Sequence, residues 1–172
     1  ILIPTLNAMN SEGFTFKGVL YVGLMLTKDG PKVVEYNARF GDPETQVVLP
    51  LLESDLFAIM RAVREGRLAE TDIRWKKESA ACIVLASGGY PGKYESGKLI
   101  SGLEDAKAAG ATVYHAGTKK TDAGYVTAGG RVLGVTALGN TLADAVHSAY
   151  AAAEKIHFEG AHMRRDIGSR DM

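Results

Sequence analysis

The sequence predicts an α+β fold made of two consecutive units. In the first, residues 1–70, an antiparallel hairpin lies among short helices, because two apolar segments rich in β-branched and aromatic residues flank a turn. In the second, residues 71–172, several short apolar segments precede one long amphipathic helix, the pattern of a small mixed α/β domain. A polar stretch at 66–78 separates the two and marks the expected boundary.

The predicted hairpin occupies residues 18–39. Its first strand covers 18–27, Asp29 and Gly30 supply the turn, and the return strand begins at Val33. An Asp-Gly pair between two apolar segments is a strong hairpin signal, because both residues tolerate the backbone angles of a tight turn. We therefore expect two antiparallel strands here.

Three helices are expected in the rest of the first unit. One covers residues 2–9, with a proline tolerated in its first turn. A second covers 42–52, where Pro50 kinks or ends it because proline lacks the backbone N–H. The third begins with Ser54 as its N-cap and ends at Gly66.

The second unit is expected to hold strands at 80–86, 111–115, 125–127 and 131–138, and a short helix at 103–109. Its clearest element is a helix over 141–156, capped by Asn140. Apolar residues recur there at intervals of four, three, four and three, which gives one continuous stripe: Leu142, Val146, Ala149, Ala153 and Ile156. The small alanines predict a helix that packs closely on a sheet.

Composition limits the class of protein. The 172 residues are 46% hydrophobic and 23% charged, as in an ordinary globular protein. Twenty acidic and twenty basic residues balance, so no clustered positive excess favours nucleic acid or an anionic membrane. No apolar stretch approaches the ~18 residues that span a bilayer. The one cysteine, Cys82, lies in an apolar segment and is expected to be a buried small hydrophobe in a reducing cytoplasm.

The most informative segment is 35–44, Glu-Tyr-Asn-Ala-Arg-Phe-Gly-Asp-Pro-Glu. Alternation along a strand predicts that Glu35, Asn37 and Arg39 share one face. A carboxylate, an amide oxygen and a guanidinium together can hold a hard divalent cation beside an oxyanion. Polar alternation alone is also typical of any half-exposed strand, but the Gly, Pro and charged residues at 40–44 favour a binding loop.

The hairpin and segment 35–44 resemble the ATP-grasp strand of glycinamide ribonucleotide synthetases (phosphoribosylamine–glycine ligases). The resemblance continues in order through Ser87–Gly92, His115–Thr118, Gly129–Leu133 and Arg165–Gly168. It covers only the C-terminal portion of these longer enzymes. The resemblance therefore implies the terminal part of an ATP-grasp domain, residues 1–70, followed by the C-terminal domain of that family, residues 71–172. The remaining N-terminal part of the same enzyme would be a partner.

The activity implied is the ATP-dependent ligation of glycine to 5-phosphoribosylamine through a glycyl phosphate. The products are glycinamide ribonucleotide, ADP and phosphate, in de novo purine synthesis. The resemblance also implies Mg²⁺ or Mn²⁺ as the metal, ATP as co-substrate and a cytoplasmic location. Two alternatives stay open: another ATP-grasp carboxylate–amine ligase, or a fragment with no activity alone.

The resemblance assigns the metal to Glu35 and Asn37. Other ATP-grasp enzymes often add an acidic residue on the preceding strand, and the expected register places that position near Gly23. Arg39 would be catalytic and would bind the substrate carboxylate, because a fixed guanidinium stabilises developing negative charge. The alternative for Arg39 is a salt bridge to Asp42 or Glu44.

Four further residues have weaker functional assignments. Asp42 would bind the amine of glycine, or it would cap a helix that opens at Pro43. Arg131 would reach the ribose phosphate of the substrate, or it would be a structural arginine. Met25 and Val34 would wall the nucleotide pocket, with ordinary core packing as the alternative.

The segment Ser87–Lys93 is a glycine-rich turn after a predicted strand. Backbone N–H groups in such a turn can cradle a phosphate. It lacks the Gly-Lys-Ser/Thr of a Walker A loop, and a plain tight loop is the simpler interpretation.

Overall fold

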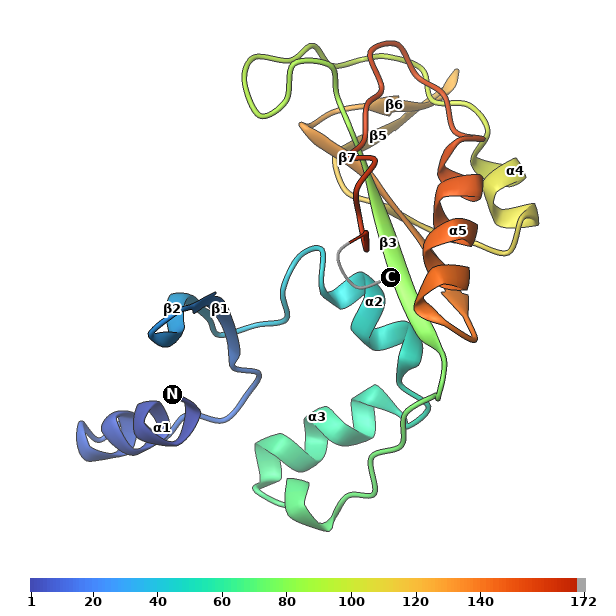
Figure 1. The fold of residues 1–172 in the computed structure, drawn as a ribbon. Coiled ribbons are helices and arrows are strands. Elements are labelled where there is room, and N and C mark those ends of the chain that lie inside the picture. Colours follow the sequence, from blue (N-terminus) through green and yellow to red (C-terminus); the bar gives the residue numbers. More distant parts are fainter. Residues whose placement is uncertain (170–172) are drawn as a thin grey trace. The chain divides into compact units, whose positions relative to one another are not determined.

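The computed structural model describes residues 1–169, which fall into two compact units. Unit 1 comprises Ile1–Glu44 and Leu52–Trp75, and unit 2 comprises Thr45–Leu51 and the chain from Lys76 onward. Figure 1 shows the elements of each unit. The expected architecture, an antiparallel hairpin with helices and then a small α/β domain, is observed. The expected division between residues 70 and 71 stays a prediction.

The hairpin of unit 1 pairs β1 (Tyr21–Thr27) with β2 (Gly30–Asn37) in antiparallel register. Gly23 pairs with Glu35, as the register predicted. The next pair joins Leu24 to Val33, so Val34 is an extra residue on β2 and forms a β-bulge.

The helices of unit 1 are α1 (Leu2–Ser11), α3 (Leu56–Glu65) and the 3-10 turn η2 (Leu68–Glu70). The C-cap of α3 is Gly66, at φ 75°, as predicted. The predicted N-cap was wrong by one residue: Asp55 accepts from the N–H of Ala58 at 3.1 Å. The hydroxyl of Ser54 instead accepts from the N–H of Arg74 at 2.8 Å, which ties the start of α3 to a later loop.

The helix predicted over 42–52 is shorter than expected. Residues 42–44 form a turn, α2 covers Thr45–Val48, and the 3-10 helix η1 covers Leu49–Leu51. Proline at position 50 has no N–H to continue an α-helical ladder, which is why the last turn tightens. Both short helices belong to unit 2.

Unit 2 is built on a three-stranded antiparallel sheet in the order β3-β7-β4, with bounds Ser79–Ala86, Arg131–Gly139 and Thr112–His115. A separate hairpin joins β5 (Thr118–Thr121) to β6 (Gly124–Thr127). The short helix α4 covers Leu103–Ala108. Strand β5 was not predicted, because its Lys119 and Lys120 interrupt any apolar alternation.

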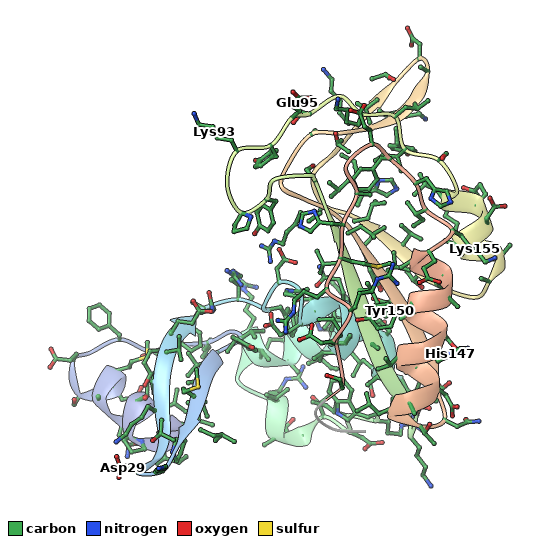
Figure 2. The ribbon with its side chains drawn as sticks, turned by 45° about the horizontal axis from the view of Figure 1, so that its top comes forward. Asp29, Lys93, Glu95, His147, Tyr150 and Lys155 are labelled. Atoms are coloured by element: carbon green, nitrogen blue, oxygen red, sulfur yellow. The ribbon has the colours of Figure 1, made fainter. Side chains whose placement is uncertain are left out.

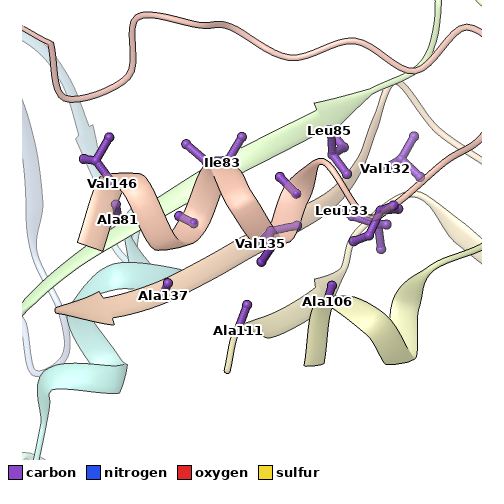
Figure 3. Close-up of a cluster of buried hydrophobic side chains, with 14 of the residues drawn as sticks. Ala81, Ile83, Leu85, Ala106, Ala111, Val132, Leu133, Val135, Ala137 and Val146 are labelled. Atoms are coloured by element: carbon purple, nitrogen blue, oxygen red, sulfur yellow. The ribbon is translucent and has the colours of Figure 1, made fainter. Parts of the chain in front are cut away.

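Helix α5 (Leu142–Ala153) packs across β3 and β7, and this contact forms the core (Figures 1 and 3). Four of the five residues in the predicted stripe are buried and Leu142 is partly buried. The helix ends at Ala153, before Ile156. Its N-cap is Thr141 rather than Asn140, and Thr141 forms a capping box with Asp144.

Strand β3 alternates in burial, and this corrects one prediction. Ala81, Ile83 and Leu85 lie against α5 in Figure 3 and are buried. Cys82 belongs to the other face of the sheet and is only partly buried, because the side chains of a strand point to opposite faces. No helix in the described residues 1–169 is long and apolar enough to cross a membrane.

Tyr150 of α5 holds the segment 164–167 by hydrogen bonds (Figure 2). The Tyr150 hydroxyl donates to the carbonyl of Arg164 at 2.9 Å and accepts from the N–H of Ile167 at 3.0 Å. Ile167 packs against the core cluster. These two hydrogen bonds and the packing of Ile167 account for the position of the Arg165–Gly168 segment.

Candidate functional site

Glu35 and Asn37 lie at the end of β2 with their side chains in contact. The amide nitrogen of Asn37 donates to Oε1 of Glu35 at 3.0 Å, which places both groups on one face, as predicted. Glu35 is exposed and Asn37 is half-buried. Their cross-strand neighbours are Gly23 and Tyr21, respectively, and the Cγ of Glu35 lies over Gly23.

A second carboxylate stands at the edge of this face. The pKa of Tyr21 is raised, first by hydrogen bonding to Glu44, then by burial and by the nearby negative charges of Glu44 and Glu35. The Glu44 carboxylate covers Gly41, and a side chain at position 41 would overlap it. The proximity of Tyr21 to Glu44 was not predicted, because it brings a strand residue near a loop that does not pair with the strand.

Arg39 lies beyond the strand, contrary to the prediction that it continues the alternation of Glu35 and Asn37. Strand β2 ends at Asn37, whose partner Tyr21 is the first residue of β1, so no strand residue lies opposite Arg39. The residue forms part of a bend, is exposed, and donates from Nη1 to the carbonyl of Phe40 at 2.8 Å.

Asp42 lies in the turn that precedes α2 and is exposed. The expectation that it caps a helix opening at Pro43 was wrong, because the helix begins at Thr45. The alternative role, binding of a substrate amine, stays a prediction.

Met25 and Val34 are on the hairpin, but neither packs into a core. The two residues are 58% and 65% exposed, respectively, so the alternative of ordinary core packing was wrong. Met25 follows Tyr21 and Gly23 at even spacing along β1 and so shares their face. The bulge at Val34 interrupts the alternation on β2.

Arg131 is the first residue of β7 in unit 2, is exposed, and pairs in register with Ala86. The neighbouring glycines serve close packing. A Cβ on Gly88 would lie 3.0 Å from the carbonyl oxygen of Gly160, and a Cβ on Gly130 would overlap the ring of Tyr90. These contacts support the tight-loop interpretation of Ser87–Lys93.

Ion pairs fix the segment that follows this loop. Lys98 contacts the carboxylates of Glu95 at 2.9 Å and Glu159 at 3.0 Å, and these partners raise the pKa of Lys98. In Figure 2, Lys93 and Glu95 project outward from the loop. These two ion pairs therefore hold the segment that follows the loop.

The donor set at Glu35 and Asn37 fits a magnesium or manganese ion. No group of three or more His, Cys, Asp or Glu side chains suited to a metal occurs in residues 1–169. Mg²⁺ needs no such cage, because it commonly takes one or two protein oxygens and leaves the others to phosphate and water. The hydrogen bond from the Asn37 nitrogen fixes the amide, whose oxygen is the remaining hard donor.

Comparison with known families and proteins identifies the relatives of this chain. Residues 80–170 match the model of the phosphoribosylglycinamide synthetase C domain, and residues 1–45 match that of the ATP-grasp (A) domain of the same synthetase. A phosphoribosylamine–glycine ligase of Caldanaerobacter subterraneus is 52% identical over 98% of this chain and 40% of its own length. The trifunctional purine biosynthetic protein adenosine-3 of Gallus gallus is 52% identical over 99% of the chain and 17% of its own length.

Solved structures agree with these matches. The phosphoribosylamine–glycine ligase of Thermotoga maritima superposes with a TM-score of 0.81 at 38% identity, over 95% of this chain and 40% of that one. The N5-carboxyaminoimidazole ribonucleotide synthetase of the same organism shares the fold, with a TM-score of 0.58 at 15% identity. The chain thus spans about 40% of the length of the ligases that it matches. Since the C-domain model alone covers more than half of its residues, this chain belongs to the phosphoribosylglycinamide synthetase family.

Proposed function

We propose that this chain is the C-terminal portion of a ligase that joins glycine to 5-phosphoribosylamine at the expense of ATP. The intermediate would be a glycyl phosphate, and the products glycinamide ribonucleotide, ADP and phosphate. The observation that carries the proposal is the contact between Glu35 and Asn37 on a hairpin that matches the ATP-grasp domain of this family. De novo purine synthesis in the cytoplasm is part of the same proposal.

The proposed roles follow the chemistry of each side chain. Glu35 and Asn37 would hold Mg²⁺ or Mn²⁺, which supplies positive charge to neutralise the phosphates of ATP when bound. Arg39 would hold the carboxylate of glycine and stabilise negative charge during its phosphorylation. Asp42 would accept the ammonium group of glycine.

Three residues would bind other parts of the substrates. Arg131 would contact the ribose phosphate of phosphoribosylamine, as a guanidinium suits a phosphate. Met25 and Val34 would contact the adenosine of ATP, and their exposure in this structure supports that role.

The test is ADP release by the full-length protein that carries this chain. We expect release that requires ATP, a divalent ion, glycine and phosphoribosylamine together. Glu35→Ala should abolish turnover and leave the circular dichroism spectrum unchanged, because Glu35 is exposed and supports no core. The matched control Glu12→Ala removes an exposed carboxylate elsewhere in unit 1. Full activity in Glu35→Ala would remove this residue from the mechanism, and release driven by another carboxylate or amine would indicate a different ligase.

A further inference from the structure

The face of the unit 2 sheet that is turned away from α5 carries a group of hydroxyl side chains. Val135 and Ala137 of β7 belong to the core cluster under α5 (Figure 3), so Thr136, which lies between them, points to the opposite face. Thr136 is directly opposite Thr112 of β4 in the register, and Tyr114 follows two residues later on β4. Three side chains with hydroxyl groups therefore share one face of two neighbouring strands.

A pocket of about 450 Å³ lies on this face. The three hydroxyl-bearing residues line it together with Leu49 and Pro50 of η1 and Leu138 of β7. All of these residues belong to unit 2, so the pocket is formed within one compact unit. Its volume lies within the range of small-molecule sites, about 300–1,000 Å³, and a lining of apolar side chains with a few polar groups is typical of such sites.

Lys76 brings a positive charge to the pocket. Its backbone N–H donates to the carbonyl of Leu51 at 2.8 Å, which fixes the residue beside η1. Lys76 is half-buried, whereas its neighbour Lys77 is exposed. Within residues 1–169, the ammonium group of Lys76 takes part in no hydrogen bond or ion pair. An anion in the pocket would be attracted strongly, because partial removal from water strengthens the interaction between opposite charges.

The hydroxyl groups can complete the recognition of an anion. Thr136 is only 3% exposed, and its hydroxyl donates to the carbonyl of Gln46 at 3.0 Å, which holds this side chain in place. Burial raises the pKa of the Tyr114 hydroxyl, with a smaller effect of the charge on Cys82, so the group stays a protonated donor at neutral pH. The hydroxyls of Thr112 and Tyr114 make no hydrogen bond to another described residue. Both can therefore donate to a ligand.

We propose that this pocket binds a small organic anion, a phosphate ester or a carboxylate that carries an apolar body. Lys76 holds the charged group, and Thr112 and Tyr114 donate hydrogen bonds to it. The apolar body packs against Leu49 and Leu138. The pocket shares no residue with the positions proposed for metal, glycine, ribose phosphate or adenosine, so this inference does not rest on the proposed ligase function.

The first experiment locates and classifies the ligand in the full-length protein. Phenyl phosphate is added to isotope-labelled protein, and the amide resonances are followed by NMR. The amides of 110–114 and 136–138 should shift in a saturable way. Phenol, which lacks the charge, and inorganic phosphate, which lacks the apolar ring, should each bind at least about tenfold more weakly. Benzoate separates the two kinds of anion: tighter binding of phenyl phosphate indicates a phosphate ester, and tighter binding of benzoate indicates a carboxylate.

The second experiment tests the residues that recognise the charge. Lys76→Gln should weaken the binding of phenyl phosphate at least about tenfold, because it removes a charge-assisted hydrogen bond. Lys77→Gln is the matched control: it removes the exposed charge next in the chain and should leave the affinity unchanged. Tyr114→Phe keeps the ring, removes only the hydroxyl, and should weaken binding about tenfold. Neither Lys76→Gln nor Tyr114→Phe should change the affinity for phenol by more than about twofold.

Three results would overturn the proposal. The first is the absence of shifts at 110–114 and 136–138 in the full-length protein, which would show that the pocket is covered or takes no anion. The second is equal affinity for phenol and phenyl phosphate, which would show that the charge is not recognised. The third is an equal loss in Lys76→Gln and Lys77→Gln, which would indicate a general effect of surface charge.

Discussion

The guanidinium of Arg39 lies on the same loop as Asp42, and both are proposed to contact the glycine substrate. Its Nη1 group donates to the carbonyl of Phe40, which limits its motion although no strand partner holds it. A donor so fixed stabilises an oxyanion without reorganisation during the reaction. The role assigned to Arg39 therefore depends on its fork of N–H groups and not only on its charge.

Arg39→Ala should lower kcat/KM for glycine by about 10²–10³, the loss typical of one preorganised oxyanion donor. Arg39→Lys should recover only a small part, because an ammonium cannot make two parallel hydrogen bonds to a carboxylate. The measurement is the steady-state rate of ADP release by the full-length protein. Arg61→Ala, at an exposed arginine on α3, is the matched control and should retain wild-type activity. Equal effects at positions 39 and 61 would contradict a specific role.

Gly130 shows a different kind of residue-level constraint. Its φ is not in the left-handed region, so the backbone would accept alanine, but the ring of Tyr90 occupies the space of the new methyl group. Gly130→Ala should therefore lower the free energy of unfolding by about 1–3 kcal/mol, the usual cost of overpacking. Urea unfolding of the chain measures it.

Removal of the ring provides the control for this prediction. In a Tyr90→Ala background, Gly130→Ala should cost almost nothing further, since the methyl group then has space. Additive losses in the double mutant would show that the ring is not the cause.

At individual residues, the sequence predicted contacts that follow from strand periodicity. Glu35 and Asn37 share a face because they are two residues apart, and Gly23 lies opposite Glu35 because the Asp-Gly turn sets the register. The proximity of Tyr21 to Glu44 depends on the path of a loop, and no periodic pattern encodes that path. The predicted N-caps of α3 and α5 each lay one residue before the observed ones. Two adjacent residues, such as Ser54 and Asp55, can both be good N-caps, and the sequence does not choose between them.

Helix α5 owes its fit to small side chains. Ala145, Ala149 and Ala152 are fully buried against the sheet of β3 and β7, where no space remains for a branched side chain. The helix was predicted from a different set of apolar positions, the stripe from Leu142 to Ile156, of which only Ala149 belongs to these three alanines. Close packing of small residues also leaves the contact sensitive to added volume.

Ala149→Leu should destabilise the chain by about 1–3 kcal/mol, because three added carbon atoms must displace strands β3 and β7. Ala151→Leu is the matched control: it adds the same atoms on the same helix at an exposed position and should change the free energy of unfolding by less than about 0.5 kcal/mol. Denaturant unfolding compares the two. Similar losses in both variants would contradict the packing argument.

The elements that the sequence missed or misjudged are short. Helix α2 has four residues, too few for a periodic signal, and its end is set by Pro50. Strand β5 also has four residues, and both of its lysines are exposed. It forms a strand because it pairs with β6. The hydrophobic pattern of the sequence is enough to predict a long element such as α5. The conformation of these short elements depends instead on the segments that they pair with or pack against.

The two units differ in how much they bury. The hydrophobic core cluster lies entirely in unit 2. In the described residues of unit 1, Ala62 is the only buried apolar side chain, and α1 buries none. Leu26 and Phe57 are 82% and 75% exposed. The folding stability of this chain therefore resides mainly in unit 2, because burial of apolar side chains is its main source.

This distribution determines what the 172-residue chain can do by itself. Met25 and Val34, the residues proposed to contact adenosine, stand on the exposed hairpin of unit 1, and the chain spans about 40% of its ligase relatives. A nucleotide that meets only part of its pocket forgoes most of its apolar and polar contacts. Isothermal calorimetry with Mg·ATP should therefore give a Kd at least about 100-fold weaker for the isolated chain than for the full-length protein, a loss of about 2.7 kcal/mol. Glu35→Ala in the full-length protein should weaken Mg·ATP binding but leave metal-free ATP binding unchanged, which separates a lost ion from a lost pocket. A Kd for the isolated chain within a few-fold of the full-length value would contradict this account, because it would place the whole nucleotide site within these residues.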